Sequence, residues 1–521
     1  MNALALENGK IWTGDGFARS LLIRGNRIQS IDGATEGASS IDLGGKLVLP
    51  GFIDNHVHFV AGGLQAMAVS LREATSLEEF AGLLAERSLA VASGEWITGG
   101  GWDEQRWTRA TLPDRHSIDR VTLGRPAFVT RMDMHMGLAN SEALRRSGIT
   151  KESADPPGGS IVRDETGEPT GILKDAAMKL VDAVIPPASI DQRIAAIRAG
   201  LREAARFGVT SFCDMGMSDE AFDDLRAYQR LDRLGELTAR ARMYLPIGSY
   251  RKLKDAGIER HFGSERLRIA GLKGFADGSL GSSTAAFHSP YEGETGNRGL
   301  LMAAMEDGSM ARWIEDADEH ELQIAIHAIG DRANDEVLRL LEARPRHQER
   351  RFRIEHAQHL DPQIIRRFAA AGVIASMQPA HAADDGRWAE SRIGAARTAM
   401  AYPFRSLLDA AASVTFGSDW PVASLDPIRG IVAAVTRQTI DGKNAAGWIP
   451  EQKVNVEEAL RCYTAANAWA TFSDKEVGTI APGMLADLAV LSGDLFSVAP
   501  EEIERITVEM TIFDGRVVHE S

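Results

Sequence analysis

The 521-residue sequence is poor in cysteine and contains no long hydrophobic run. Its two cysteines, Cys213 and Cys462, cannot form a disulfide framework, so they fit a reducing compartment. No stretch approaches the roughly 18 uninterrupted apolar residues of a membrane span, and the start of the chain lacks the basic and apolar regions of a signal peptide. We therefore expect a cytoplasmic protein with no membrane partner.

Lysine is also scarce, supplying 11 of the 58 basic residues. Against these stand 73 acidic residues, which give a net charge of −15. Such an excess of acid argues against a nucleic acid or an anionic membrane as the main partner. The apolar share of 44% and the charged share of 25% are typical of globular proteins and exclude a disordered or fibrous chain.

Both ends of the chain have the pattern of short strands and tight turns. Residues 21–31 and 507–518 are hairpin patterns around Gly25-Asn26 and Asp514-Gly515, and 486–491 is a further strand. Neither end is long enough to bury a core alone. We predict one small β-sandwich domain assembled from residues 1–50 and 476–521.

Between the two ends, apolar strands alternate with helical stretches, which indicates an α/β protein with a parallel sheet. The strands predict a (β/α)8 TIM barrel over residues 51–475. The eight candidate strands are Gly51–His58, Ala127–Arg131, Val209–Asp214, Ile269–Phe275, Gln323–His327, Arg353–His356, Val373–Met377 and Val414–Gly417. The candidate helices are Ile190–Phe207, Asp219–Leu234, Met310–His320, Asp331–Leu341, Pro362–Ala371 and Asp426–Thr436.

Two gaps between these strands exceed a normal connecting loop. Residues 60–125 and 136–189 are predicted insertions in the barrel, and the second contains a hairpin pattern. Both follow the carboxyl end of a predicted strand, where barrel active sites lie. We expect both to form walls of a pocket.

Histidines and an aspartate gather at the carboxyl ends of the predicted strands. His56 and His58 are two residues apart on one strand, so they point to the same face and can ligate one divalent ion. His327, His356 and Asp419 each follow an apolar run on another strand. A His-x-His pair alone is a weak signal, but the five residues together predict a shared metal site.

Lys273 lies on the fourth predicted strand, and its ammonium has no lone pair for a metal. A buried lysine can lose its charge, and the neutral amine can then be carboxylated to a carbamate whose oxygens bridge two metals. An ordinary ion pair, with Asp277 as partner, explains the residue equally well.

The sequence resembles the amidohydrolase superfamily over nearly its whole length. The matching pieces are Leu49–His58, the Lys273 segment, His327, His356, Gly417-Ser418-Asp419 and Gly478–Leu488. It is most similar to the amidohydrolase-3 branch, typified by N-substituted formamide deformylases. The pieces for this branch are Gly101-Trp102-Asp103, Asp133-Met134-His135 with Asn140-Ser141, Asp277-Gly278-Ser279, His327–Asp331 and Ser418–Pro421.

This resemblance implies a set of ligands and a reaction. His56, His58 and Asp419 would hold one metal, His327 and His356 a second, and a carboxylated Lys273 would bridge them. The reaction implied is hydrolysis of a carbon–nitrogen bond, in an amide or an N-acyl or N-formyl compound. A homodimer is an expectation from the family alone.

Metal-activated water explains why these residue types occur together. A divalent ion lowers the pKa of bound water to ~7 and polarises the scissile carbonyl. Asp419 would take the proton and pass it to the leaving amine, and His135 would contact the substrate or its oxyanion unless it only bonds to its own loop. Histidine and carboxylate ligands suit zinc, and also iron or manganese. We predict zinc, as one ion or two.

Two other functions remain compatible with the sequence. An ester or lactone hydrolase needs the same activated water. A regulatory or binding protein on a hydrolase scaffold is a third reading, although such a protein need not keep Asp419.

Overall fold

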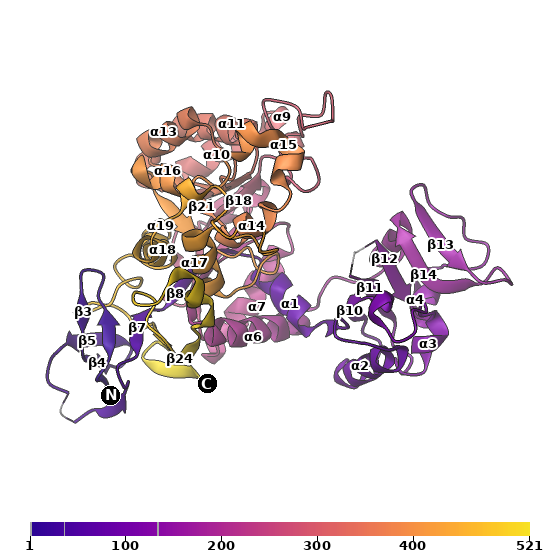
Figure 1. Ribbon diagram of the computed structural model, residues 1–521, viewed down its shortest axis with the longest axis horizontal. Coiled ribbons are helices and arrows are strands. Elements are labelled where there is room, and N and C mark those ends of the chain that lie inside the picture. The colour runs from indigo at the N-terminus through magenta and orange to yellow at the C-terminus, as the bar shows by residue number, and fades with distance from the viewer. Residues whose placement is uncertain (1–2, 36, 133–134) are drawn as a thin grey trace. The chain divides into compact units, whose positions relative to one another are not determined.

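The chain forms two compact units in the computed structural model, which describes residues 3–35, 37–132 and 135–521 (Figure 1). One unit comprises residues 1–62 and 197–521, and the other comprises residues 63–196. Asp133 and Met134 of the branch motif lie outside the described residues. The domain limits predicted from the sequence, 1–50 with 476–521 and 51–475, stay a prediction, because this division into compact units does not test them.

The larger unit contains a nearly closed barrel of eight parallel strands, which confirms the predicted (β/α)8 class. The strands, in their order around the sheet, are β22 (Val414–Phe416), β21 (Ile374–Met377), β20 (Arg353–His356), β19 (Gln323–Ala328), β18 (Leu267–Phe275), β16 (Arg240–Pro246), β15 (Val209–Met215) and β8 (Phe52–Val57). The two ends of the sheet meet through a parallel bridge between Val57 and Trp420. All carboxyl strand ends therefore face one mouth.

Helices follow the barrel strands, and the six predicted from periodicity are all present. They are α6 (Ile190–Arg206), α7 (Ala221–Leu234), α10 (Ser309–Glu319), α11 (Asp331–Glu342), α13 (Pro362–Ala371) and α17 (Pro427–Thr436). Helix α13 shows why such boundaries can be predicted. Asp361 accepts two backbone N–H groups at its start, Pro362 occupies the first turn, and Gly372 ends it at φ 63°.

Shorter helices complete the unit around the barrel mouth and beneath it. They are α1 (Phe59–Met67), α8 (Tyr250–Asp255), α9 (Ala303–Glu306), α12 (His347–Arg350), α14 (Pro379–Asp385), α15 (Ala389–Thr398), α16 (Phe404–Asp409), α18 (Val456–Tyr463) and α19 (Ala465–Ala470). Among the described residues, no helix is long and apolar enough to cross a bilayer.

One predicted barrel strand was wrong. Ala127–Arg131 forms β11 in the sheet of the 63–196 unit, and the third barrel strand is instead β16, Arg240–Pro246. Strand β11 is apolar and buried, so its pattern is that of any buried parallel strand. Strand β16 begins Arg-Ala-Arg, which has the composition of a surface segment although both arginines are buried.

Strands from both ends of the chain form two further sheets in the larger unit. One has the order β5 (Arg27–Ile31), β4 (Leu21–Arg24), β1 (Ala3–Glu7), β6 (Ser39–Asp42). The other has the order β25 (Arg516–Glu520), β24 (Val508–Phe513), β23 (Leu488–Leu491), β7 (Leu47–Pro50), β2 (Lys10–Trp12), β3 (Phe17–Ala18). Both contribute to one buried apolar cluster, which includes Leu6, Ile23, Val48, Leu488 and Ile512. This is the predicted sandwich.

The 63–196 unit is a mixed sheet with helices of its own. The sheet has the order β13 (Gly159–Arg163), β14 (Pro169–Asp175), β12 (Met136–Ala139), β11 (Ala127–Arg131), β10 (Ile97–Trp102), β9 (Val69–Ser70). Its helices are α2 (Leu77–Ala90), α3 (Arg115–Asp119), α4 (Ser141–Arg146) and α5 (Lys179–Asp182). Two apolar clusters, built around Trp102 and Leu173, form its interior.

Candidate metal centre

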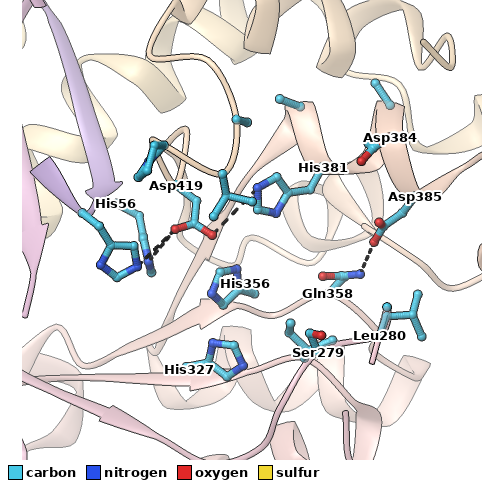
Figure 2. Close-up of a pocket in the computed structure, with 18 of the residues that line it drawn as sticks. His56, Ser279, Leu280, His327, His356, Gln358, His381, Asp384, Asp385 and Asp419 are labelled. Carbon is cyan, nitrogen blue, oxygen red and sulfur yellow. Dashed lines mark hydrogen bonds and ion pairs between the residues drawn. The ribbon is translucent and has the colours of Figure 1, made fainter. Parts of the chain in front are cut away.

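Five of the predicted ligands meet at the mouth of the barrel. Figure 2 labels all of them except His58. His56 and His58 come from the end of β8, His327 from β19, His356 from β20, and Asp419 from the turn after β22. One ligand atom from each of His56, His356 and Asp419 lies within 4.8 Å of the other two. Because parallel strands end at one edge, residues far apart in the sequence converge here.

The remaining two histidines extend this group. His58 Nε2 lies 3.3 Å from Asp419 Oδ1, and the ring centroids of His327 and His356 are 4.5 Å apart. A backbone carbonyl oxygen contacts a ring nitrogen of both His58 and His327. The contact is Met215 O at 2.8 Å for His58 and Gly278 O at 3.0 Å for His327. Such contacts fix a ring's orientation for ligation.

Lys273 is buried on β18, and no hydrogen bond reaches its Nζ among the described residues. Burial lowers its pKa to about 8, so a neutral amine is accessible near neutral pH. The alternative partner Asp277 accepts backbone N–H groups from Ala286, Ile329 and Gly330 instead.

The residues at this mouth fit a divalent cation. Among the described residues that line the cavity, four buried polar atoms have no hydrogen-bond partner: Lys273 Nζ, His356 Nδ1, His381 Nε2 and Asp419 Oδ1. Burial lowers the pKa of His56 to about 4 and that of His327 to about 3, so both rings are neutral and present a lone pair. Burial would raise the pKa of Asp419, but neighbouring His56 and His58 hold it well below its usual range.

A buried charged network beneath the ligands holds His56 in place. Glu355, fully buried on β20, accepts from His56 Nδ1 at 2.6 Å and from Ser376 Oγ at 2.7 Å. Arg353 donates to both oxygens of Glu355, at 2.7 Å and 3.0 Å, and to Asn55 Oδ1 at 2.8 Å. Burial alone would raise the pKa of Glu355, but Arg353 and the hydrogen bond from His56 lower it by more. The net pKa falls below its usual range, so the side chain stays ionised. Sequence reasoning missed this carboxylate.

The backbone at two ligands is strained. His356 has φ 71° and Asp419 has φ 60°, in the left-handed region that residues with a side chain rarely adopt. Asp54 supports the backbone next to Asp419, because its Oδ1 accepts hydrogen bonds from the backbone N–H groups of His56 and Ser418. Strain of this kind collects at functional sites, where surrounding contacts maintain it.

The ligands line a cavity of about 790 Å³. Much of its wall is apolar, with Met217, Phe275, Leu280, Ile329, Trp388 and Val422 among the lining residues. Its polar side chains include His381 and Asp385 on α14 and Gln358 just after β20 (Figure 2). His381 Nε2 lies 3.8 Å from Asp419 Oδ2. These three were missed: Gln358 follows β20, which ends at His356, and the other two follow β21, which carries no proposed ligand.

His135, predicted to contact the substrate, belongs to the 63–196 unit. Its side chain is 78% exposed, and its Nδ1 lies 2.8 Å from Asp175 Oδ1. Its part in catalysis stays a prediction.

Comparisons with known proteins identify the family of this chain. The model of the amidohydrolase family matches residues 40–519. The protein LONG AFTER FAR-RED 3 of Arabidopsis thaliana is 38% identical, over 94% of this chain and 87% of its own length. N-substituted formamide deformylase of Arthrobacter pascens is 27% identical, over 100% and 99%.

A solved structure is similar to the whole fold. An uncharacterized metal-dependent hydrolase from Pyrococcus horikoshii superposes with a TM-score of 0.79 at 29% identity, covering 96% of this chain and 99% of its own. The family match spans the barrel, every proposed ligand and the part of the sandwich from residue 40 onward. The chain therefore belongs to the amidohydrolase family.

Proposed function

We propose that this protein is a zinc-dependent hydrolase that cleaves the carbon–nitrogen bond of a small amide or N-acyl compound in the cytoplasm. One observation carries the proposal: buried ligand atoms that have no hydrogen-bond partner among the described residues converge in a largely apolar cavity. Leaving such atoms unpaired costs about 1–3 kcal/mol each, which a bound cation offsets.

Six residues would hold the metal: His56, His58, Lys273, His327, His356 and Asp419. A bound divalent ion supplies a water of lowered pKa and polarises the carbonyl to be attacked. A carboxylated Lys273 would add oxygen ligands, and its buried amine of lowered pKa supports this modification.

Asp419 is the proposed base. Its low pKa keeps it ionised, and its Oδ1 has no described hydrogen-bond partner, so it can accept a proton from the attacking water. It then delivers this proton to the nitrogen that leaves. A C–O bond forms, the C–N bond breaks, and the products are a carboxylic acid and an amine. His135 remains a proposed substrate contact.

One relative supports the choice of a C–N bond, and the cavity wall supports an apolar substituent on the substrate. One relative is named for deformylating N-substituted formamides, and it matches this chain over its full length. The cavity offers apolar side chains beside the ligands, which suits a substrate with an apolar substituent.

The test is hydrolysis of N-cyclohexylformamide by protein stripped with a chelator and then reloaded with zinc. We expect amine release to vanish on stripping and return on reloading. Asp419→Asn should lower kcat about 10²- to 10⁴-fold. Hydrolysis that survives complete metal removal, or no hydrolysis by the loaded protein, would contradict the proposal.

The metal content per chain tests whether Lys273 contributes to metal binding. Two ions per chain in the wild type and fewer in Lys273→Ala would support a carbamate bridge. Lys254→Ala, an exposed lysine of α8, is the control and should leave the metal content unchanged. An unchanged content in Lys273→Ala would make this residue structural.

A further inference from the structure

Gln358 carries an amide that the metal ligands do not use. It follows His356 by two residues, is 3% exposed and lines the cavity. Its Nε2 donates to Asp385 Oδ2 at 2.7 Å and lies 3.3 Å from His359 Nε2. Both hydrogens of the amide nitrogen therefore have an acceptor on the side away from the ligands.

These contacts fix which way the amide faces. Asp385 Oδ2 also accepts from the Tyr402 hydroxyl at 2.6 Å, so the carboxylate acts as an acceptor. Burial lowers the pKa of His359 to about 3, so its ring is neutral and its Nε2 can accept as well. A flipped amide would place Gln358 Oε1 against the oxygen of Asp385 and lose both bonds.

The oxygen of Gln358 is left facing the cavity. Figure 2 shows the nitrogen end toward Asp385 and the oxygen end toward the side of His356. Among the described residues, no hydrogen bond to this oxygen is found. An acceptor open to the cavity can take a hydrogen bond from a donor on the bound molecule, and the group of a scissile amide that can donate is its N–H.

We propose that Gln358 determines specificity by accepting the N–H of the scissile amide, so that the enzyme takes secondary amides in preference to esters. This rests on the proposed function and names its substrate class. An ester presents a lone pair where the amide presents a hydrogen, and oxygen against oxygen is unfavourable. Once water has added to the carbonyl, the N–H still points to Gln358, and the nitrogen lone pair is free to take the proton from Asp419.

The test compares N-cyclohexylformamide with cyclohexyl formate, which replaces the N–H by an oxygen. Gln358→Met removes the acceptor at similar size. Asp385→Asn keeps Gln358 but lets its amide turn, because the new side-chain NH2 can donate to Oε1. Gln363→Met, an exposed glutamine of α13, is the matched control.

We expect Gln358→Met and Asp385→Asn to lower the amide-to-ester ratio of kcat/KM about 10- to 100-fold, a typical worth of one hydrogen bond in a closed site. Ester hydrolysis retained in the same samples shows that fold and metal are intact. Gln363→Met should keep the wild-type ratio.

Each failure has a distinct meaning. A ratio unchanged in Gln358→Met, or a wild type that prefers the ester, overturns the specificity role and leaves the metal-dependent hydrolase in place. A zinc-loaded wild type that cleaves neither compound contradicts the proposed function, and the specificity role with it. Equal falls for amide and ester would show that Gln358 acts on structure alone.

Discussion

At the scale of single residues, Glu355 links the metal ligands to the barrel interior. Its carboxylate holds His56 Nδ1 at 2.6 Å, which fixes the tautomer whose Nε2 faces Asp419. We predict that Glu355→Gln lowers zinc affinity about 10- to 100-fold, as loss of a carboxylate behind a ligating histidine typically does. Competition with a chromogenic chelator measures this affinity.

Glu355→Gln also leaves Arg353 buried beside a neutral amide, so the free energy of unfolding must be measured together with the zinc affinity. Removing one partner of a buried ion pair costs about 3–5 kcal/mol. Glu349→Gln, on an exposed glutamate of α12, should change neither affinity nor stability. Full zinc affinity in a folded Glu355→Gln protein would refute the role of Glu355.

His359 predicts a pH dependence of stability. Its pKa is about 3 in the folded chain against 6.5 for the free group, because it is buried. Between these values the unfolded chain binds a proton that the folded chain does not, so acidification favours unfolding by up to about 1.4 kcal/mol per pH unit. His359→Phe removes this penalty, because phenylalanine does not titrate.

Urea unfolding of metal-free wild type and His359→Phe at pH 7, 6 and 5 measures the effect. The wild type should lose stability relative to the variant as the pH falls below 6.5. A difference between the two proteins that stays constant over this range would mean that the folded state protonates His359 as easily as the unfolded one.

The convergence of the proposed ligands could be predicted at this scale, whereas the residues that hold them in place could not. His56, His327, His356 and Asp419 each end an apolar strand, a signal that is local in the sequence. Glu355 has no such signal, since it lies inside β20 and its partners His56 and Ser376 are on other strands. Its role depends on which strands are neighbours, and composition does not determine that.

At the scale of elements, strand β16 is joined to the sandwich by a buried arginine. Arg240 donates to Asp487 at 2.7 Å and 2.9 Å and to Asp514 at 2.5 Å, and it is fully buried. We predict that Arg240→Met destabilises the protein by about 3–5 kcal/mol, because Asp487 loses its charged partner and Asp514 keeps only Arg266. Arg233→Met, on an exposed arginine of α7, is the control for thermal unfolding.

The same arginine explains the strand that the sequence did not predict. Buried parallel strands are usually continuous apolar runs, and Arg240 and Arg242 interrupt that pattern. The burial of Arg240 is possible because Asp487, just before β23, and Asp514, just after β24, accept its hydrogen bonds from far along the chain. Helices were predicted more reliably, since their caps and periodicity lie within one segment, as in α13.

At the scale of the whole molecule, the 63–196 unit is self-contained in its packing. Its apolar clusters draw all their residues from positions 69–185. A compact unit with its own core is expected to fold alone. We predict that a fragment of residues 68–186 is folded, with cooperative thermal unfolding by circular dichroism and resistance to limited proteolysis.

A fragment of equal length cut from the barrel, residues 197–315, provides the control. It contains β15, β16 and β18 but lacks β8 and β19, the neighbours that pair with the outer strands of this set. It should therefore remain unfolded, because its exposed strand edges have no partner. An unfolded 68–186 fragment would show that this unit depends on the rest of the chain for its stability.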